Sequence, residues 1–128
     1  MTAAEAPSDA DICATADALL AGDEVAADRV RAAVLATLAS LAALAPGRSV
    51  EIRVPPHAAV QAVPGAVHRR GTPRARVECD ARTWLALACG RLEWSAAAAL
   101  PGLHASGERS DLSPYLPLVP GKAGQSTP

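Results

Sequence analysis

The segment of residues 80–118 limits the choice of fold most, because glycine and proline residues divide it into short elements. It holds both tryptophans, the one tyrosine and nearly all the large apolar side chains of the second half of the chain. The pattern predicts a helix that Asp80 caps and Gly90 ends, a short helix closed by a Pro-Gly pair, a strand over 103–106 and a last helix with Pro114 in its first turn. The function has to be sought in what this segment encloses.

The first part of the chain is predicted to form two helices, over residues 9–21 and 23–45. Ser8 followed by Asp11 is typical of a helix start, because a serine side chain can accept a hydrogen bond from the third backbone N–H of a helix. A glycine ends the first helix, and a Pro-Gly pair ends the second because the residue before a proline avoids the helical conformation. Two helices cannot form a four-helix bundle, so they need a sheet to cover.

The middle of the chain predicts the strands of that sheet. Val50, Ile52 and Val54 alternate with charged residues, and residues 57–63 and 74–79 can supply further strands. The predicted order is helices, then several short strands, then helices around one more strand. This order indicates an α+β fold with a mainly antiparallel sheet of about 4–5 strands. We expect one domain over residues 1–119, with the sheet and its later helices in 49–119 and a disordered tail over 120–128.

The composition argues against several classes of function. A net charge of −1 gives no general attraction to nucleic acid or to an anionic membrane. Half of the residues are apolar but many of them are alanine, so the core is expected to be thin or to leave space. The N-terminal residues lack the pattern of a signal peptide, and the apolar run 30–45 is too short and too mild for a membrane span. We expect a cytoplasmic protein with no membrane span and no nucleic-acid partner.

The cysteines and histidines do not have the spacing of a metal site. Cys13, Cys79 and Cys89 form an odd set without a C-x-x-C pair, which suits a reducing compartment. Cys79 and Cys89 could form a redox pair, or the cysteines could be small apolar side chains of the core. The three histidines lie in three different segments, and neither a metal nor a cofactor is expected.

One predicted loop is strongly basic. Four arginines and one histidine fall within residues 68–76, with glycine and proline between them. These side chains could bind a carboxylate, a phosphate or an acidic partner, or they could form a solvated loop and strand edge whose charge discourages pairing between sheets. The candidate residues for an anion or head group are His68, Arg69, Arg70 and Arg74.

A longer series of motifs covers about residues 50–118. Over 80–118 the order is Asp, Trp-Leu-x-Leu, Gly-Arg, Trp, an alanine run, Gly, Ser-Gly-x-Arg, Asp-Leu and Tyr-Leu-Pro-Leu. This order resembles bacterial sterol carrier proteins, above all a short actinobacterial group, in which HRRGTP at 68–73 is similar to a His-x-Arg-Gly-x-Pro stretch. Glu108 departs from the aspartate of the wider superfamily. The same fold recurs in the C-terminal domain of mycothiol-dependent maleylpyruvate isomerases.

The resemblance implies a twisted, mostly antiparallel sheet with helices on one face and an apolar tunnel between them. Members of the family with such tunnels bind fatty acyl chains or sterols. The aromatic side chains of the segment could line this tunnel or fill it, and the last predicted helix is the candidate lid. The candidate tunnel or lid residues are Trp84, Leu87, Trp94, Leu103, Leu112, Tyr115 and Leu116.

Three functions compete. The first is a non-catalytic carrier of an apolar lipid, with Arg70 and its neighbours holding an acidic head group. The second is a protein-interaction or accessory domain with a filled core, whose partner is unknown. The third is an enzyme, or an accessory subunit of a thiol-dependent isomerase. The sequence has no Ser-His-Asp set, no activated-cysteine motif and no histidine before His57, whereas the related isomerases carry metal-binding histidines in a separate N-terminal bundle. We therefore expect a carrier and not an enzyme.

Overall fold

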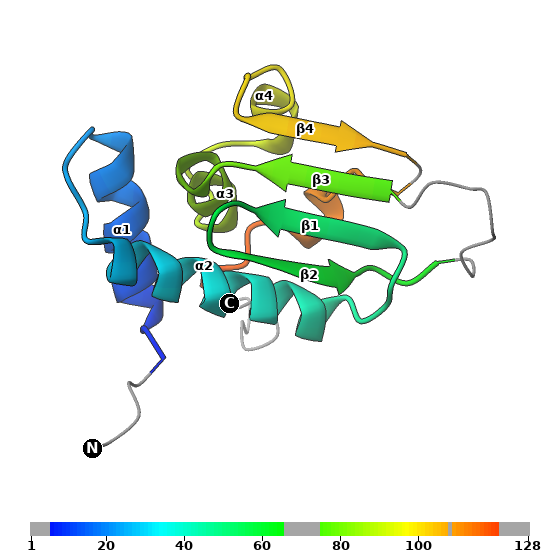
Figure 1. Ribbon diagram of the computed structural model, residues 1–128, viewed down its shortest axis with the longest axis horizontal. Coiled ribbons are helices and arrows are strands. Elements are labelled where there is room, and N and C mark those ends of the chain that lie inside the picture. The colour runs from blue at the N-terminus through cyan, green and yellow to red at the C-terminus, as the bar shows by residue number, and fades with distance from the viewer. Residues whose placement is uncertain (1–5, 66–74, 108, 121–128) are drawn as a thin grey trace, which may run out of the picture.

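Helices pack on a four-stranded sheet in the computed structural model, which describes residues 6–65, 75–107 and 109–120 (Figure 1). The strands lie in the order β2-β1-β3-β4 across the sheet. They are β1 (Val50–Val54), β2 (Ala58–Ala62), β3 (Ala75–Cys79) and β4 (Leu103–Ser106). The α+β class predicted from the sequence is confirmed.

The sheet combines two antiparallel pairs with one parallel pair. β1 pairs antiparallel with β2, and β3 pairs antiparallel with β4, whereas the central strands β1 and β3 run parallel. Because β2 occupies one edge of β1, β3 enters along the other edge, where Ile52 lies opposite Val77. The predicted mainly antiparallel sheet is confirmed, and the parallel pair at its centre adds a feature that strand patterns do not reveal.

The two faces of the sheet differ in the way that the period-2 pattern predicts. On the outer face, Arg76 Nε lies 3.3 Å from Glu51 Oε1, so charged side chains occupy that face. The inner face is apolar and packs under the helices. Its buried side chains on the two central strands are Val50, Ile52, Val54, Ala75, Val77 and Cys79.

The two N-terminal helices are α1 (Asp9–Leu20) and α2 (Ala27–Leu44). The predicted start of α1 is confirmed, because Ser8 Oγ accepts a hydrogen bond from the Asp11 N–H at 3.1 Å and the Asp11 carboxylate accepts one from the Ser8 N–H at 3.3 Å. α2 begins later than predicted, since the Asp23 N–H still donates to the Ala18 carbonyl of α1. Figure 1 shows α2 running along β2, with α1 beyond the end of the sheet.

The C-terminal part follows the predicted order except at its last element. α3 (Ala81–Ala88) starts at Asp80, whose carboxylate accepts a hydrogen bond from the Thr83 N–H at 2.8 Å, and α4 (Trp94–Ala97) precedes β4. The predicted last helix is wrong, because only the 3₁₀ turn η1 (Ser113–Tyr115) forms there. Leu116 is extended, with ψ of 149°. Proline at the next position disfavours the helical conformation and lacks the N–H that a helix needs.

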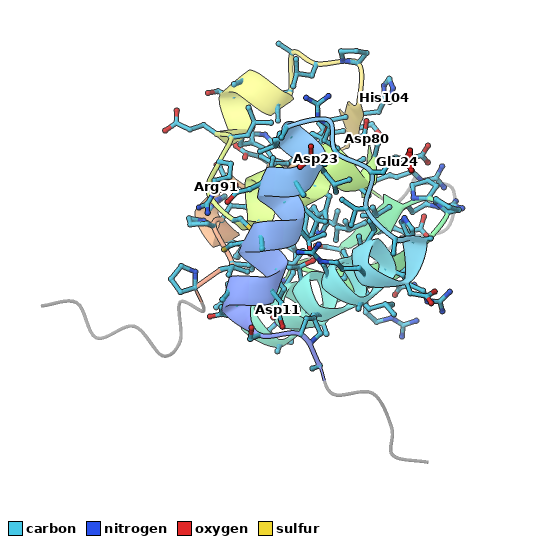
Figure 2. All side chains as sticks on the ribbon, turned by 90° about the vertical axis from the view of Figure 1, so that its left-hand side faces the viewer. Asp11, Asp23, Glu24, Asp80, Arg91 and His104 are labelled. Carbon is cyan, nitrogen blue, oxygen red and sulfur yellow. The ribbon has the colours of Figure 1, made fainter. Side chains whose placement is uncertain are left out.

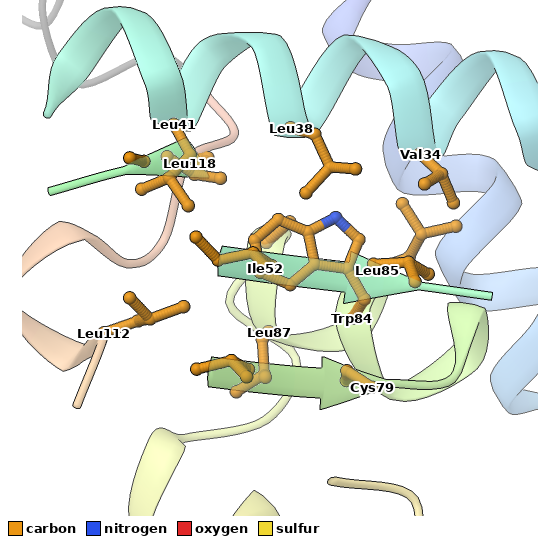
Figure 3. Close-up of a cluster of buried hydrophobic side chains, with 14 of the residues drawn as sticks. Val34, Leu38, Leu41, Ile52, Cys79, Trp84, Leu85, Leu87, Leu112 and Leu118 are labelled. Carbon is orange, nitrogen blue, oxygen red and sulfur yellow. The ribbon is translucent and has the colours of Figure 1, made fainter. Parts of the chain in front are cut away.

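Trp84 lies in the centre of the core, between α3 and α2 (Figure 3). Its side chain is fully buried, and its indole N–H points toward α2 and donates to Thr37 Oγ1 at 2.8 Å. The Thr37 hydroxyl in turn donates to the Ala33 carbonyl at 2.8 Å. Leu112, from the C-terminal segment, is also fully buried in this cluster. The space around Trp84 is therefore filled by side chains.

Candidate functional site

A pocket of about 530 Å³ opens between the end of α3, the start of α4 and the segment around η1. This volume lies within the range of about 300–1,000 Å³ that is typical of small-molecule sites. Its apolar lining consists of Leu87, Leu92, Trp94, Leu116 and Pro117, and its remaining lining of Gly90, Glu93, Ser95, Asp111 and Ser113.

Backbone contacts hold the two walls of the pocket together. The carbonyl of Ala88, at the end of α3, accepts hydrogen bonds from the N–H groups of Leu118 and Val119 at 2.8 and 2.9 Å. Gly90 ends α3 with φ of +72°, which glycine adopts without strain, and a side-chain carbon at this position would lie 3.4 Å from Pro117. The C-terminal wall is thereby fixed against α3.

The apolar lining combines a buried floor with half-buried walls. Leu87 of α3 is only 1% exposed, whereas Leu92, Trp94 and Leu116 are half-buried at the edge of the core. A molecule that covers these side chains removes apolar surface from water, which is favourable by roughly 25 cal/mol per Å². The half-buried indole of Trp94 adds a flat surface for stacking or close contact. This wall can therefore bind an apolar molecule.

The polar lining is acidic. Glu93 and Asp111 contribute two exposed carboxylates, and Ser95 and Ser113 contribute hydroxyl groups. One oxygen of Asp111, Oδ1, accepts a hydrogen bond from the Ser113 N–H at 2.9 Å. Glu93 precedes α4, but its side chain makes no capping hydrogen bond there. None of the described residues that line the pocket is basic.

The structure brings three of the predicted ligand residues together. Leu87, Trp94 and Leu116 come from three different elements of the predicted segment and all line the pocket. Gly90 was predicted only as the end of a helix, yet it is part of the lining together with Pro117. The acidic and serine residues of the lining carry no sequence signal for a site, because nothing in their spacing shows that residues 93–95 and 111–113 meet.

The other four predicted ligand residues lie elsewhere. Trp84 and Leu112 fill the core, so Leu112 anchors the C-terminal segment and is not an exposed lid residue. Tyr115 packs half-buried against the core and does not line the pocket. Leu103 lines a second hollow, of about 560 Å³, on the outer face of the sheet.

This second hollow is mainly polar. The charged side chains of Arg76 and Glu78 and the imidazole of His104 line it, together with small residues of β4 and Ala98. His104 lies on the exposed edge strand (Figure 2). An apolar molecule would gain little there, because the lining offers Leu103 and a few alanines only. The pocket at Leu87, Trp94 and Leu116 is the stronger candidate.

The cysteines are free thiols in a packed environment. Cys13 of α1 is the thiol that interacts with Cys89, and not the predicted Cys79. Burial first, and then the Cys13 contact, raises the pKa of Cys89 to about 12. Burial first, and then the charge of Asp80, raises the pKa of Cys79 to about 12. Both thiols stay protonated at neutral pH, as small apolar side chains do in a core.

Some of the predicted residues lie outside the part of the chain that the structure describes, and two expected absences can be examined only within that part. The candidate head-group residues His68, Arg69, Arg70 and Arg74, and all of the predicted tail except Pro120, lie outside the described residues. Within 6–65, 75–107 and 109–120, no three His, Cys, Asp or Glu side chains are grouped so that they could hold a metal ion. None of the described helices has the length and apolar character that crossing a membrane requires.

Comparison with known proteins places the chain in a family. A family model described as "Bacterial SCP ortholog" matches residues 26–118, a range that contains α2, the whole sheet and every described residue that lines the pocket. No curated protein matches the chain. The match agrees with the resemblance to bacterial sterol carrier proteins, while the relation to the isomerase domains stays a prediction.

Proposed function

The chain belongs to the bacterial SCP ortholog family of sterol carrier proteins, and we propose that it binds and carries an apolar molecule in the pocket beside Trp94. The observation that carries the proposal is the apolar lining of this pocket. Leu87, Trp94 and Leu116 are contributed by three elements, and the backbone contacts of Ala88 fix two of them, α3 and the C-terminal segment, together. A preformed apolar surface of this kind favours binding, because little has to be ordered when the ligand enters.

We propose a non-catalytic role. The described lining contains neither a histidine nor a cysteine, so Ser95 and Ser113 lack a neighbouring imidazole that could activate them. The raised thiol pKa values of Cys79 and Cys89 make these cysteines poor nucleophiles. A carrier needs neither group. The free thiols also support a place in a reducing compartment such as the cytoplasm.

Native mass spectrometry of the purified protein tests the proposal first. We expect the protein to retain a lipid-sized mass that solvent extraction removes. The extracted protein should then bind an uncharged fluorescent probe, N-phenyl-1-naphthylamine, with a rise in the fluorescence of the probe. A protein that is free of ligand before extraction and also leaves the probe unchanged would contradict the carrier function.

Two matched leucine variants locate the site. Leu116→Ala removes part of the apolar wall of the pocket. We expect this to weaken the binding free energy of the probe by about 1.4 kcal/mol, so the probe should bind about tenfold more weakly. Leu35→Ala makes the same change on the outer side of α2, where Leu35 is 42% exposed, and the affinity should not change. Equal affinities of the two variants would place the probe outside the pocket.

A protein-interaction domain is the second candidate function, and the filled core favours it. Trp84 and Leu112 are fully buried, so the described interior around them offers no space for a lipid chain. The pocket beside Trp94 lies at the surface, where a peptide side chain could also enter. A purified protein that binds no apolar small molecule would leave this as the favoured function.

A further inference from the structure

The charges around the pocket select the polar end of its ligand, an inference that rests on the proposed function. Glu93 and Asp111 place two exposed carboxylates on the lining, beside the hydroxyl groups of Ser95 and Ser113. We propose that the bound molecule is apolar with a polar end that donates hydrogen bonds and carries no negative charge, such as a hydroxyl or an ammonium group.

Arg91, which is close to Glu93 in the sequence, does not pair with these carboxylates. Arg91 stands between two lining residues in the sequence, but its guanidinium is directed to α1 (Figure 2). Its Nε lies 2.9 Å from Asp17 Oδ1, its Nη2 lies 3.2 Å from Asp17 Oδ2, and its Nη1 donates to the Cys89 carbonyl at 2.9 Å. Such a two-pronged pair holds the planar guanidinium in one orientation. Arg91 therefore forms its ion pair with Asp17 of α1 and not with a carboxylate of the pocket.

Both carboxylates have acceptor atoms that no described residue occupies. Asp111 Oδ1 accepts the Ser113 N–H, which orients the carboxylate, while no other described residue bonds to Oδ2. The carboxylate of Glu93 likewise has no hydrogen bond or ion pair with any described residue. Because a carboxylate oxygen only accepts hydrogen bonds, these atoms match a donor on the ligand.

This arrangement ranks three classes of ligand. An ammonium group forms charge-assisted hydrogen bonds with carboxylates, and a hydroxyl group donates an ordinary one. A fatty carboxylate brings a third negative charge next to Glu93 and Asp111, and no described lining residue offers it a positive partner. We expect the order of affinity to be amine, then alcohol, then carboxylate.

Three compounds with the same twelve-carbon chain test this order. Dodecylamine, dodecanol and laurate would each displace N-phenyl-1-naphthylamine from the protein at pH 7 and low salt, at concentrations below those at which they form micelles. Laurate should bind at least about tenfold more weakly than dodecanol. The difference between the two affinities should be smaller in high salt, because salt screens exposed charges. Laurate binding as tightly as dodecanol would overturn the inference but leave the carrier function intact, whereas no displacement by any compound would contradict both.

Charge-removing variants assign the effect to its residues. Glu93→Gln and Asp111→Asn should each reduce the ratio of dodecanol affinity to laurate affinity by several-fold. The asparagine side chain keeps an oxygen that can accept the hydrogen bond from the Ser113 N–H. Glu24→Gln is the matched control, because Glu24 is an exposed carboxylate before α2 and does not line the pocket. A shift as large in Glu24→Gln as in Glu93→Gln would show an effect of net charge alone and would overturn the inference.

Discussion

Replacing Thr37 by valine tests whether Trp84 is a structural residue with a specific hydrogen bond. Thr37 and Trp84 are both fully buried, and the indole N–H donates to Thr37 Oγ1 at 2.8 Å. Valine has nearly the shape of threonine but no oxygen, so the indole N–H loses its acceptor while the packing is kept. Thr37 also donates to the Ala33 carbonyl, but that carbonyl still accepts the helical hydrogen bond of α2 in the variant.

The expected loss of stability comes from the buried indole N–H of Trp84, which has no acceptor in the variant. Leaving a buried polar group without its partner costs about 1–3 kcal/mol, whereas the methyl group gained by valine recovers little in a site that is already filled. We expect Thr37→Val to lower the free energy of unfolding by about 2 kcal/mol. With a typical urea slope of about 1–3 kcal/mol per M, the midpoint should move by about 1 M.

Urea unfolding followed by far-ultraviolet circular dichroism measures this change. Thr15→Val is the matched control: Thr15 is 1% exposed, but its hydroxyl donates only to the Asp11 carbonyl of its own helix. We expect the control to change the free energy of unfolding by less than about 0.5 kcal/mol. In a Trp84→Phe background, Thr37→Val should cost much less than in the native protein. Equal costs for Thr37→Val and Thr15→Val, or no coupling with Trp84, would show that the hydrogen bond between Trp84 and Thr37 does not stabilise the fold.

Further changes test the thiols and the end of α3. In the folded protein at pH 8, iodoacetamide should leave Cys79 and Cys89 unmodified, since burial raises both thiol pKa values; rapid alkylation of either, seen by peptide mass spectrometry, would contradict this. Folding raises both pKa values from 9.0 to about 12, so their contribution to stability is complete below pH 9 and is lost as the pH rises toward 12. Over this pH range, the free energy of unfolding measured in urea should fall by at most about 1.4 kcal/mol per pH unit for each thiol. Cys79→Ala should make this fall smaller. Gly90→Ala should cost about 1 kcal/mol in thermal unfolding because φ is +72°, and an unchanged melting temperature would argue against the left-handed end of α3.

The sequence predicted those parts of the fold that depend on local patterns. The capping residues Ser8 and Asp80 and the alternation in 50–54 and 74–79 led to α1, α3, β1 and β3. The parallel pairing of β1 with β3 could not be predicted, because it depends on which edge of β1 stays free after β2 returns. The last element is a 3₁₀ turn and not the predicted helix, because the proline after Leu116 disfavours the helical conformation at that residue.

The candidate site was predictable only in part. Leu87, Trp94 and Leu116 were chosen as large apolar residues of one segment, and the same criterion chose Trp84 and Leu112, which fill the core. Type and spacing do not separate these two groups, because exposure at a pocket depends on how three distant elements meet. The carboxylates of Glu93 and Asp111 were missed for the same reason.

The two tryptophans allow one spectrum to test whether an apolar ligand binds beside Trp94 while Trp84 fills the interior. Each indole N–H gives its own signal in a proton–nitrogen correlation spectrum of the ¹⁵N-labelled protein, and Trp94→Phe assigns them by removing one. On addition of dodecanol, the Trp94 signal should shift progressively and the signal of Trp84, bonded to Thr37, should stay in place. A larger shift of the Trp84 signal, or no shift of either at saturating ligand, would contradict binding beside Trp94.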